Sequence, residues 1–227
     1  MRTELPLEQR VESLLAEMTL AEKVGQTHQS ANIHPVEDRE LIRLGGIGSS
    51  LLASGATAGN ERDAGVRVSA IDAAQRIAVE ESRLGIPLLF ARDVIHGHRT
   101  VFPIPLGLAA AWDEDLVFRT AQLAAAEASR DGVAWTFAPM LDICEDPRWG
   151  RVAESLGEAP VLAGRLGAAM VRGFQGDTPG GDRARGAGTV AACAKHFVGY
   201  GLLAVHRVTR SRSARGLPPA VTLLRCP

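Results

Sequence analysis

The sequence predicts an α/β fold with a parallel sheet, and two observations support this. Short apolar segments alternate along the chain with segments that have the hydrophobic period of a helix, which is the order of parallel βαβ units. Polar side chains also gather directly after three of the apolar segments, around residues 93–96, 142–146 and 195–196. Because parallel strands end at one edge of a sheet, where such proteins bind ligands, we expect these side chains to form one site.

Periodicity and capping signals define the expected helices. Residues 7–18 place apolar side chains at the i, i+3, i+4, i+7 spacing of an amphipathic helix. The following stretch, Thr19–Glu22, is a capping box that starts a second, short helix. Ser69 and Asp113 are the expected N-caps of two further helices. The longer helices are therefore expected at 7–18, 69–84, 113–130 and 159–175.

Four strands are expected between these helices. Each is an apolar run bounded by glycine, proline or polar residues. The runs cover residues 47–52, 88–94, 135–143 and 189–197. The small, polar segments 55–65 and 176–188 are expected to be loops.

Composition argues against several classes of protein. The 227 residues are 46% hydrophobic and 22% charged, and the net charge of −1 gives no sign of a nucleic-acid or membrane partner. Three cysteines without CxxC spacing argue against a disulfide framework. The N-terminal segment carries charges throughout and lacks the apolar run of a signal peptide, so we expect a cytoplasmic location.

Three stretches carry the residues whose side chains could bind or react with a ligand. They are ARDVIHGHRTVFPIPLGLAAAWD at 91–113, WTFAPMLDICEDPRWGRVAESLGE at 135–158 and KHFVGYG at 195–201. Asp93 ends an apolar strand, and from the residue alone it could be a nucleophile or an acceptor of charge-assisted hydrogen bonds from two hydroxyl groups of a ligand. Adjacent residues of a regular strand face opposite sides. The pair at 195–196 can therefore reach one ligand only if the strand ends or bends there.

The HxH pattern at 96–98 offers a different interpretation. Metal-dependent barrel hydrolases use such a pair at a strand end, where neutral imidazoles bind the ion. A site of that kind needs further ligands from later strands, and only two histidines, His196 and His206, follow this segment. The ligand count therefore favours a site without metal, and the metal-dependent hydrolase is kept as an alternative.

Together with LLAEMTLAEKVGQ near the N-terminus, the three stretches resemble the N-terminal barrel of glycoside hydrolase family 3, especially its bacterial, periplasmic-type β-glucosidases. The resemblance covers roughly residues 5–201. It implies about the first half of a (β/α)8 TIM-type barrel, because a full barrel has eight strands in ~250 residues. It also implies hydrolysis of terminal β-D-glucosyl units of small β-glucosides or oligosaccharides, with no cofactor.

The resemblance also implies roles for individual side chains. The residues that match the family's sugar-binding positions in the −1 subsite are Asp93, Arg151, Lys195 and His196. Contact of both Lys195 and His196 with one sugar implies an irregular peptide between them. Trp149 is expected at the pocket wall, and Glu154 is expected to orient Arg151 or Lys195.

Two arginines of the DPRWGR motif compete for the sugar contact. Both offer planar donor forks, and the resemblance favours Arg151. Arg148 is then expected to brace its own loop through Asp146 or Glu145. The alternative, with Arg148 on the sugar, stays open.

Bond cleavage would require further residues. Retaining glycosidases use two carboxylates about 5–5.5 Å apart. In the family the nucleophile is an Asp on a later strand, and the acid/base usually comes from a following domain. Both would lie after Gly201, where this sequence has no acidic residue. No catalytic residue is assigned, and the chain is expected to be a truncated, inactive fragment, with a non-catalytic sugar-binding module as the alternative.

The end of the chain departs from the family pattern. From Arg183 onward the sequence has eight lysines and arginines and no acid. We expect a domain at 1–201 and a non-homologous basic tail at 202–227, either disordered or derived from a frameshift, with a real alternative terminus as the other interpretation. Half a barrel would leave open strand edges, which predicts self-association.

Overall fold

The computed structural model describes residues 6–51, 64–176, 188–197 and 199–202. The chain divides into two compact units, Met1–Arg92 and Asp93–Pro227. Most of the two expected polar loops, and nearly all of the expected tail at 202–227, lie outside the described residues.

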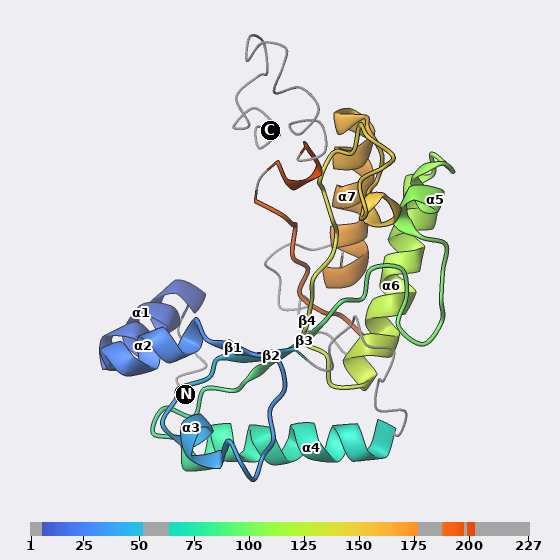
Figure 1. The fold of residues 1–227 in the computed structure, drawn as a ribbon. Coiled ribbons are helices and arrows are strands. Elements are labelled where there is room, and N and C mark those ends of the chain that lie inside the picture. Colours follow the sequence, from blue (N-terminus) through green and yellow to red (C-terminus); the bar gives the residue numbers. More distant parts are fainter. Residues whose placement is uncertain (1–5, 52–63, 177–187, 198, 203–227) are drawn as a thin grey trace. The chain divides into compact units, whose positions relative to one another are not determined.

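Unit 1 is a small parallel sheet with helices. Its strands pair in parallel in the order β1, β2, β3, with Gln29 opposite Ser49 and Ser49 opposite Leu89. In Figure 1 the helices α3 and α4 lie below these strands. The elements are α1 (Leu7–Glu17), α2 (Leu20–Gln26), β1 (Gln29–Ser30), α3 (Arg39–Arg43), β2 (Ser49–Leu51), α4 (Ala64–Arg76), the π-helical turn η1 (Ile77–Glu81) and β3 (Leu89–Arg92).

Apolar side chains between these elements form the core of unit 1. Strand β3 and the segment before β2 contribute one side of it, and α3, α4 and η1 contribute the other. Its buried members are Ile42, Ile47, Ile71, Ala74, Ile77, Ala78, Leu88 and Phe90. The burial of such side chains is the main favourable contribution to folding.

One helix prediction in unit 1 needs correction, and the expected helix at 7–18 is confirmed. Helix α4 begins at Ala64, so Ser69 lies inside the helix and is not its N-cap. A serine hydroxyl can bond to the backbone within a helix, and its presence alone therefore does not mark a helix start. Helix α1 forms at the expected place, but none of its residues is buried, and Val11 and Leu15 on its apolar face are each nearly half exposed.

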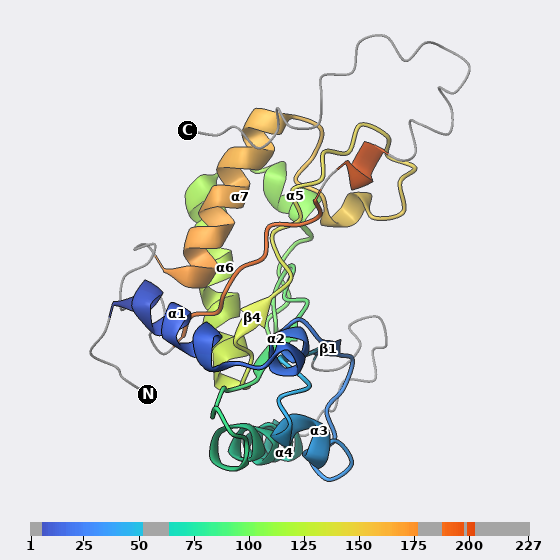
Figure 2. The same ribbon diagram turned by 90° about the vertical axis from the view of Figure 1, so that its left-hand side faces the viewer.

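Unit 2 contains two long helices that lie side by side in both views (Figures 1 and 2). Asp113 caps the first of them, because its Oδ1 accepts a hydrogen bond of 2.9 Å from the Leu116 N–H. The elements are α5 (Pro105–Ala109), α6 (Glu114–Arg130), β4 (Trp135–Thr136), the 3-10 turn η2 (Val152–Glu154), α7 (Pro160–Gln175) and the 3-10 turn η4 (Tyr200–Leu202).

The two expected strands at 135–143 and 189–197 are mostly irregular. Only β4 is a regular strand there, and two isolated parallel bridges, Trp135 to Ala191 and Met140 to Lys195, join the segments. Pro139 gives the physical reason, because a proline inside a strand cannot donate a ladder hydrogen bond. The segments still run alongside each other, since Pro139 O accepts a hydrogen bond from the Lys195 N–H at 3.1 Å.

No helix in the described part of the chain is both long enough and apolar enough to cross a lipid bilayer.

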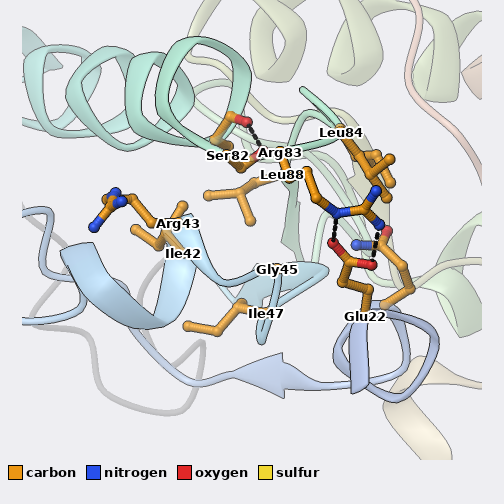
Figure 3. A pocket seen from close by; sticks show the side chains of 12 residues that line it. Glu22, Ile42, Arg43, Gly45, Ile47, Ser82, Arg83, Leu84 and Leu88 are labelled. Carbon is orange, nitrogen blue, oxygen red and sulfur yellow. Dashed lines mark hydrogen bonds and ion pairs between the residues drawn. The ribbon is translucent and has the colours of Figure 1, made fainter. Parts of the chain in front are cut away.

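The capping box at the start of α2 is confirmed and is joined to a distant arginine. Thr19 N–H donates to Glu22 Oε2 at 2.8 Å, and the Glu22 N–H donates to Thr19 Oγ1 at 3.2 Å. Arg83 donates to both oxygens of the same carboxylate, at 3.0 and 2.6 Å, beside a small hollow that Figure 3 shows. Hydrogen bonds from Arg83 and Thr19 lower the pKa of Glu22 to about 2.

We expect this arrangement to make unit 1 sensitive to acid. The carboxyl pKa of Glu22 is lower in the folded state than its usual 4.5. The ionised carboxylate therefore stabilises the folded state above pH 4.5, and this stabilisation is lost as the pH falls toward about 2. Urea titrations between pH 7 and pH 2.5 should therefore show a steeper loss of stability for the wild type than for Glu22→Gln. Glu40→Gln, in an exposed pair with Arg43, is the matched control and should follow the wild type. Equal slopes for all three proteins would contradict the assignment.

Candidate functional site

The first component of the site is an ion pair between residues about a hundred positions apart. Lys195 Nζ lies 2.9 Å from Asp93 Oδ1, and the side chain of Lys195 is only 13% exposed. Backbone bonds on either side hold Lys195, because its carbonyl accepts from the Leu141 N–H at 2.7 Å and its own N–H donates to Pro139 O. Asp93 and Lys195 therefore come together as the sequence predicts.

The second component is a histidine fixed by a buried carboxylate. Asp142 Oδ2 lies 2.6 Å from Nδ1 of His196 and also accepts from the His196 backbone N–H at 3.1 Å. The Asp142 side chain is 1% exposed. The peptide between Lys195 and His196 is cis.

The third component is the pair formed by Arg151 and Glu154. Arg151 donates through Nε and Nη2 to the two carboxylate oxygens at 2.7 and 2.6 Å. These bonds raise the pKa of Arg151, and they lower the pKa of Glu154, to which the nearby charge of Lys195 also contributes. The remaining nitrogen of Arg151, Nη1, lies 3.3 Å from Nε2 of His196. Glu154 is thus paired with Arg151, one of the two partners named for it, and its role in orienting that side chain stays a prediction.

Aromatic rings support this network from one side. Tyr200 lies edge-on to His196, with 4.9 Å between ring centres, and edge-on to Trp149 at 5.4 Å. The guanidinium carbon of Arg151 lies 5.6 Å from the Tyr200 ring centre, close enough for a cation–π interaction. Trp149 is itself buried against Met140, so it backs Tyr200 from a small core.

Arg148 points to a different partner. Its Nε and Nη2 bind the carboxylate of Asp146 at 2.9 and 2.7 Å, and the Arg148 side chain is 75% exposed. The hydrogen bonds from Arg148 lower the pKa of Asp146 to about 2. Asp146 is one of the two partners expected for Arg148, and the bracing role itself stays a prediction.

The two histidines of the HxH pattern have separate partners. His96 Nδ1 lies 3.0 Å from Phe102 O, and His98 Nε2 lies 2.7 Å from Asp131 Oδ2. Among the residues described, no three His, Cys, Asp or Glu side chains are grouped so that they could hold a metal ion. The geometry therefore offers no positive support for the metal-dependent alternative.

Sequence reasoning missed two residues of this network. Asp142 appeared only as one member of a polar group after a strand, and Tyr200 was not singled out. A strand-end carboxylate that is flanked by apolar residues, as Asp142 is in the sequence Met-Leu-Asp-Ile, is a signal for a buried acid that needs a partner. For Tyr200 the sequence contains no comparable signal.

The assembled site is a compact set of hydrogen-bonding groups. Carboxylates, an ammonium group, a guanidinium group and an imidazole from three separate segments lie together, with an aromatic ring beside them. Such a set of charged donors and acceptors suits a small ligand with several hydroxyl groups.

Comparison with known proteins gives a consistent picture. The model of the "Glycosyl hydrolase family 3 N terminal domain" matches residues 19–212. A "Periplasmic beta-glucosidase" of Salmonella typhimurium is 40% identical over 194 residues, with 84% of this chain and 23% of that protein covered. A "Lysosomal beta glucosidase" of Dictyostelium discoideum is 34% identical, with 84% of this chain and 26% of that protein covered. The chain thus spans about a quarter of the length of these relatives.

Solved structures agree with the sequence matches. The β-glucosidase of Listeria innocua in complex with glucose is 38% identical with a TM-score of 0.68, and the match covers 86% of this chain and 27% of that one. The exo-1,3/1,4-β-glucanase of a Pseudoalteromonas species is 37% identical with a TM-score of 0.76, over 88% of this chain and 26% of that one.

The expected cellular location is wrong. The cytoplasmic location, which rested on the lack of a recognisable signal segment, is contradicted by relatives that are named periplasmic and lysosomal enzymes. The first residues of a chain that spans a quarter of its relatives do not report where the whole protein resides.

Proposed function

Because the chain belongs to the family of glycosyl hydrolase family 3 N-terminal domains, we propose that its network of charged side chains forms one wall of a site for a terminal β-D-glucosyl unit. The ligand would be a small β-glucoside or oligosaccharide. The side chains proposed to contact the sugar are Asp93, Arg151, Lys195 and His196. Family membership also confirms the predicted fold class, an α/β fold of the TIM-barrel type.

One observation carries the proposal. The four proposed contacts come from three segments far apart in the sequence, yet Asp93 is paired with Lys195, and the adjacent His196 is in contact with Arg151. Solved relatives support a sugar as the ligand, since the enzyme of Listeria innocua is described in complex with glucose, isofagomine and laminaribiose.

Each group has hydrogen-bonding capacity left for a sugar. Asp93 binds Lys195 through one oxygen, which leaves the other to accept from a hydroxyl. The ammonium group of Lys195 has three N–H donors, and Asp93 accepts from one of them. Arg151 is held by Glu154 through Nε and Nη2, and one N–H of Nη1 faces His196, so the second N–H of Nη1 remains for donation.

We propose further that the 227-residue chain binds sugar without cleaving glycosides. Hydrolysis with retention needs a nucleophilic carboxylate and a second carboxyl group as acid and base, about 5–5.5 Å apart. The three carboxylates of the network are each engaged by a basic side chain. Double displacement would need two carboxylates that are not engaged in this way. The first candidate is thus an inactive part of a β-glucosidase. The second candidate is a module whose function is only to bind sugar, and the same pairing of carboxylates favours it.

Titration with methyl β-D-glucoside, combined with a turnover assay on a chromogenic β-glucoside, tests the proposal. We expect saturable binding without release of the chromophore. Asp93→Asn should weaken binding by about 10- to 100-fold, because a hydrogen bond to a charged group contributes about 1.5–3 kcal/mol. Asp115→Asn, an exposed position in α6, is the matched control and should bind as the wild type does. Sustained turnover, or equal binding by both variants, would refute the proposal.

Self-association of the chain through the open edges of an incomplete barrel stays a prediction, which sedimentation velocity would test.

A further inference from the structure

Asp142 is a buried carboxylate that is not itself one of the proposed sugar contacts. Its Oδ2 accepts from the backbone N–H of His196 at 3.1 Å and lies 2.6 Å from Nδ1 of the same residue. One oxygen thus holds the main chain and the ring of His196 together, and the ring has little freedom to turn.

The contacts of the ring determine where its proton lies. Arginine can only donate hydrogen bonds, so Nε2 of His196, 3.3 Å from Arg151 Nη1, must offer its lone pair. The proton of a neutral ring then sits on Nδ1, where it is donated to the carboxylate of Asp142. A proton on Nε2 would set two donors against each other at the Arg151 contact.

We propose that Asp142 is a positioning residue that holds His196 as the neutral Nδ1–H tautomer. The single lone pair of Nε2 then faces Arg151 Nη1 in the sugar-free chain and accepts from a sugar hydroxyl when one takes that place. Two of the other proposed contacts, Arg151 and Lys195, can only donate. His196 and Asp93 are therefore the acceptors of the set. His196 selects for a group that can donate a proton, which a hydroxyl does and a fluorine or a methoxy group does not.

The first test needs no sugar, and it uses a variant only to assign the signals. In a chain labelled with 15N-histidine, the shifts and couplings of the two ring nitrogens distinguish the tautomers, and the His196→Gln spectrum assigns the signals. We expect a protonated Nδ1 and an unprotonated Nε2 at pH 7.5. A predominant Nε2–H tautomer or an imidazolium would overturn the proposal, whether or not the chain binds sugar.

The second test removes the positioning group. In Asp142→Ala the 15N shifts of the His196 ring should no longer be those of a fixed Nδ1–H tautomer. They should move toward the shifts of an imidazole that exchanges between its two tautomers. Asp131→Ala breaks a similar pair, with His98 as its partner, and serves as the matched control, which should leave the His196 signals unchanged. An unaltered His196 spectrum in folded Asp142→Ala would contradict the role. Should that variant not fold, the wild-type spectrum decides alone.

The third test concerns specificity and rests on the proposed function. Methyl β-D-glucosides in which each hydroxyl is replaced in turn by hydrogen or by fluorine are titrated against the wild type and His196→Phe. One hydroxyl should no longer contribute to the binding affinity in His196→Phe. In the wild type, replacing that hydroxyl by hydrogen or by fluorine should weaken binding equally, by about tenfold for one lost hydrogen bond. Better binding of the fluoro compound there would mean that His196 donates, which overturns the proposal. If no sugar binds at all, the proposed function fails and the tautomer measurement still decides the role of Asp142.

Discussion

Arg151→Ala should lower the affinity of the chain for methyl β-D-glucoside on the order of 100-fold, close to the upper value of about 3 kcal/mol for a hydrogen bond to a charged group. The variant loses the Nη1 donor that lies beside His196. It also leaves the partly buried carboxylate of Glu154 without the partner that binds both of its oxygens. Isothermal titration gives the affinity, and far-UV circular dichroism checks that the variant is folded.

Arg148→Ala is the matched control, since it lies three positions earlier in the same motif. Its guanidinium is mostly exposed and bound to Asp146, so we expect less than about a threefold change in affinity, as for an exposed ion pair. Arg151→Lys should fall between the two, because lysine keeps the charge but cannot form the bidentate pair. If Arg148→Ala lost more affinity than Arg151→Ala, the assignment of the two arginines would have to be reversed.

Gly25→Ala should destabilise unit 1 by about 3 kcal/mol or more, because overpacking of a tight contact costs about 1–3 kcal/mol even where the surroundings can adjust. A Cβ atom at position 25 would lie 1.9 Å from Gly45 O and 2.9 Å from the Cα of Gly46. Both are main-chain atoms, so α2 would have to move away from the turn that precedes β2. Urea unfolding and hydrogen exchange of the α2 amides measure the effect.

Gly164→Ala provides the comparison, since this glycine is also inside a helix. Nothing lies within 4 Å of a Cβ atom there, and alanine is favoured over glycine in a helix by about 1 kcal/mol. A small gain in stability is therefore expected. A similar, mild effect of both substitutions would show that α2 does not pack as closely as described.

The parts of the fold that sequence predicts well have local causes. The capping box at the start of α2 and the Asp113 cap of α6 each involve residues within three positions of one another, and α7 begins next to a proline at its expected start. The 3-10 turns and the interrupted pairing around residues 135–143 and 189–197 depend instead on contacts between distant segments. Hydrophobic pattern alone cannot distinguish such a segment from a regular strand.

The candidate site shows the same division. The sugar contacts proposed for it rest on whole motifs that resemble those of a known family, whereas each residue alone is consistent with a loop cap or an ion pair. The sequence does not identify Asp142 as part of the site, because its contact is with His196, a partner 54 positions away. The roles of these residues in binding remain proposals, and so does the boundary between a domain at 1–201 and a tail at 202–227.

The central claim is that a sugar is held where Asp93, Lys195, His196 and Arg151 meet. Crystals of the chain grown with a saturating concentration of glucose test this most directly. We predict electron density for one glucose ring within hydrogen-bond distance of all four side chains, with Tyr200 beside it. A well-defined glucose bound elsewhere, or a fully ordered site that stays without sugar at that concentration, would contradict the account.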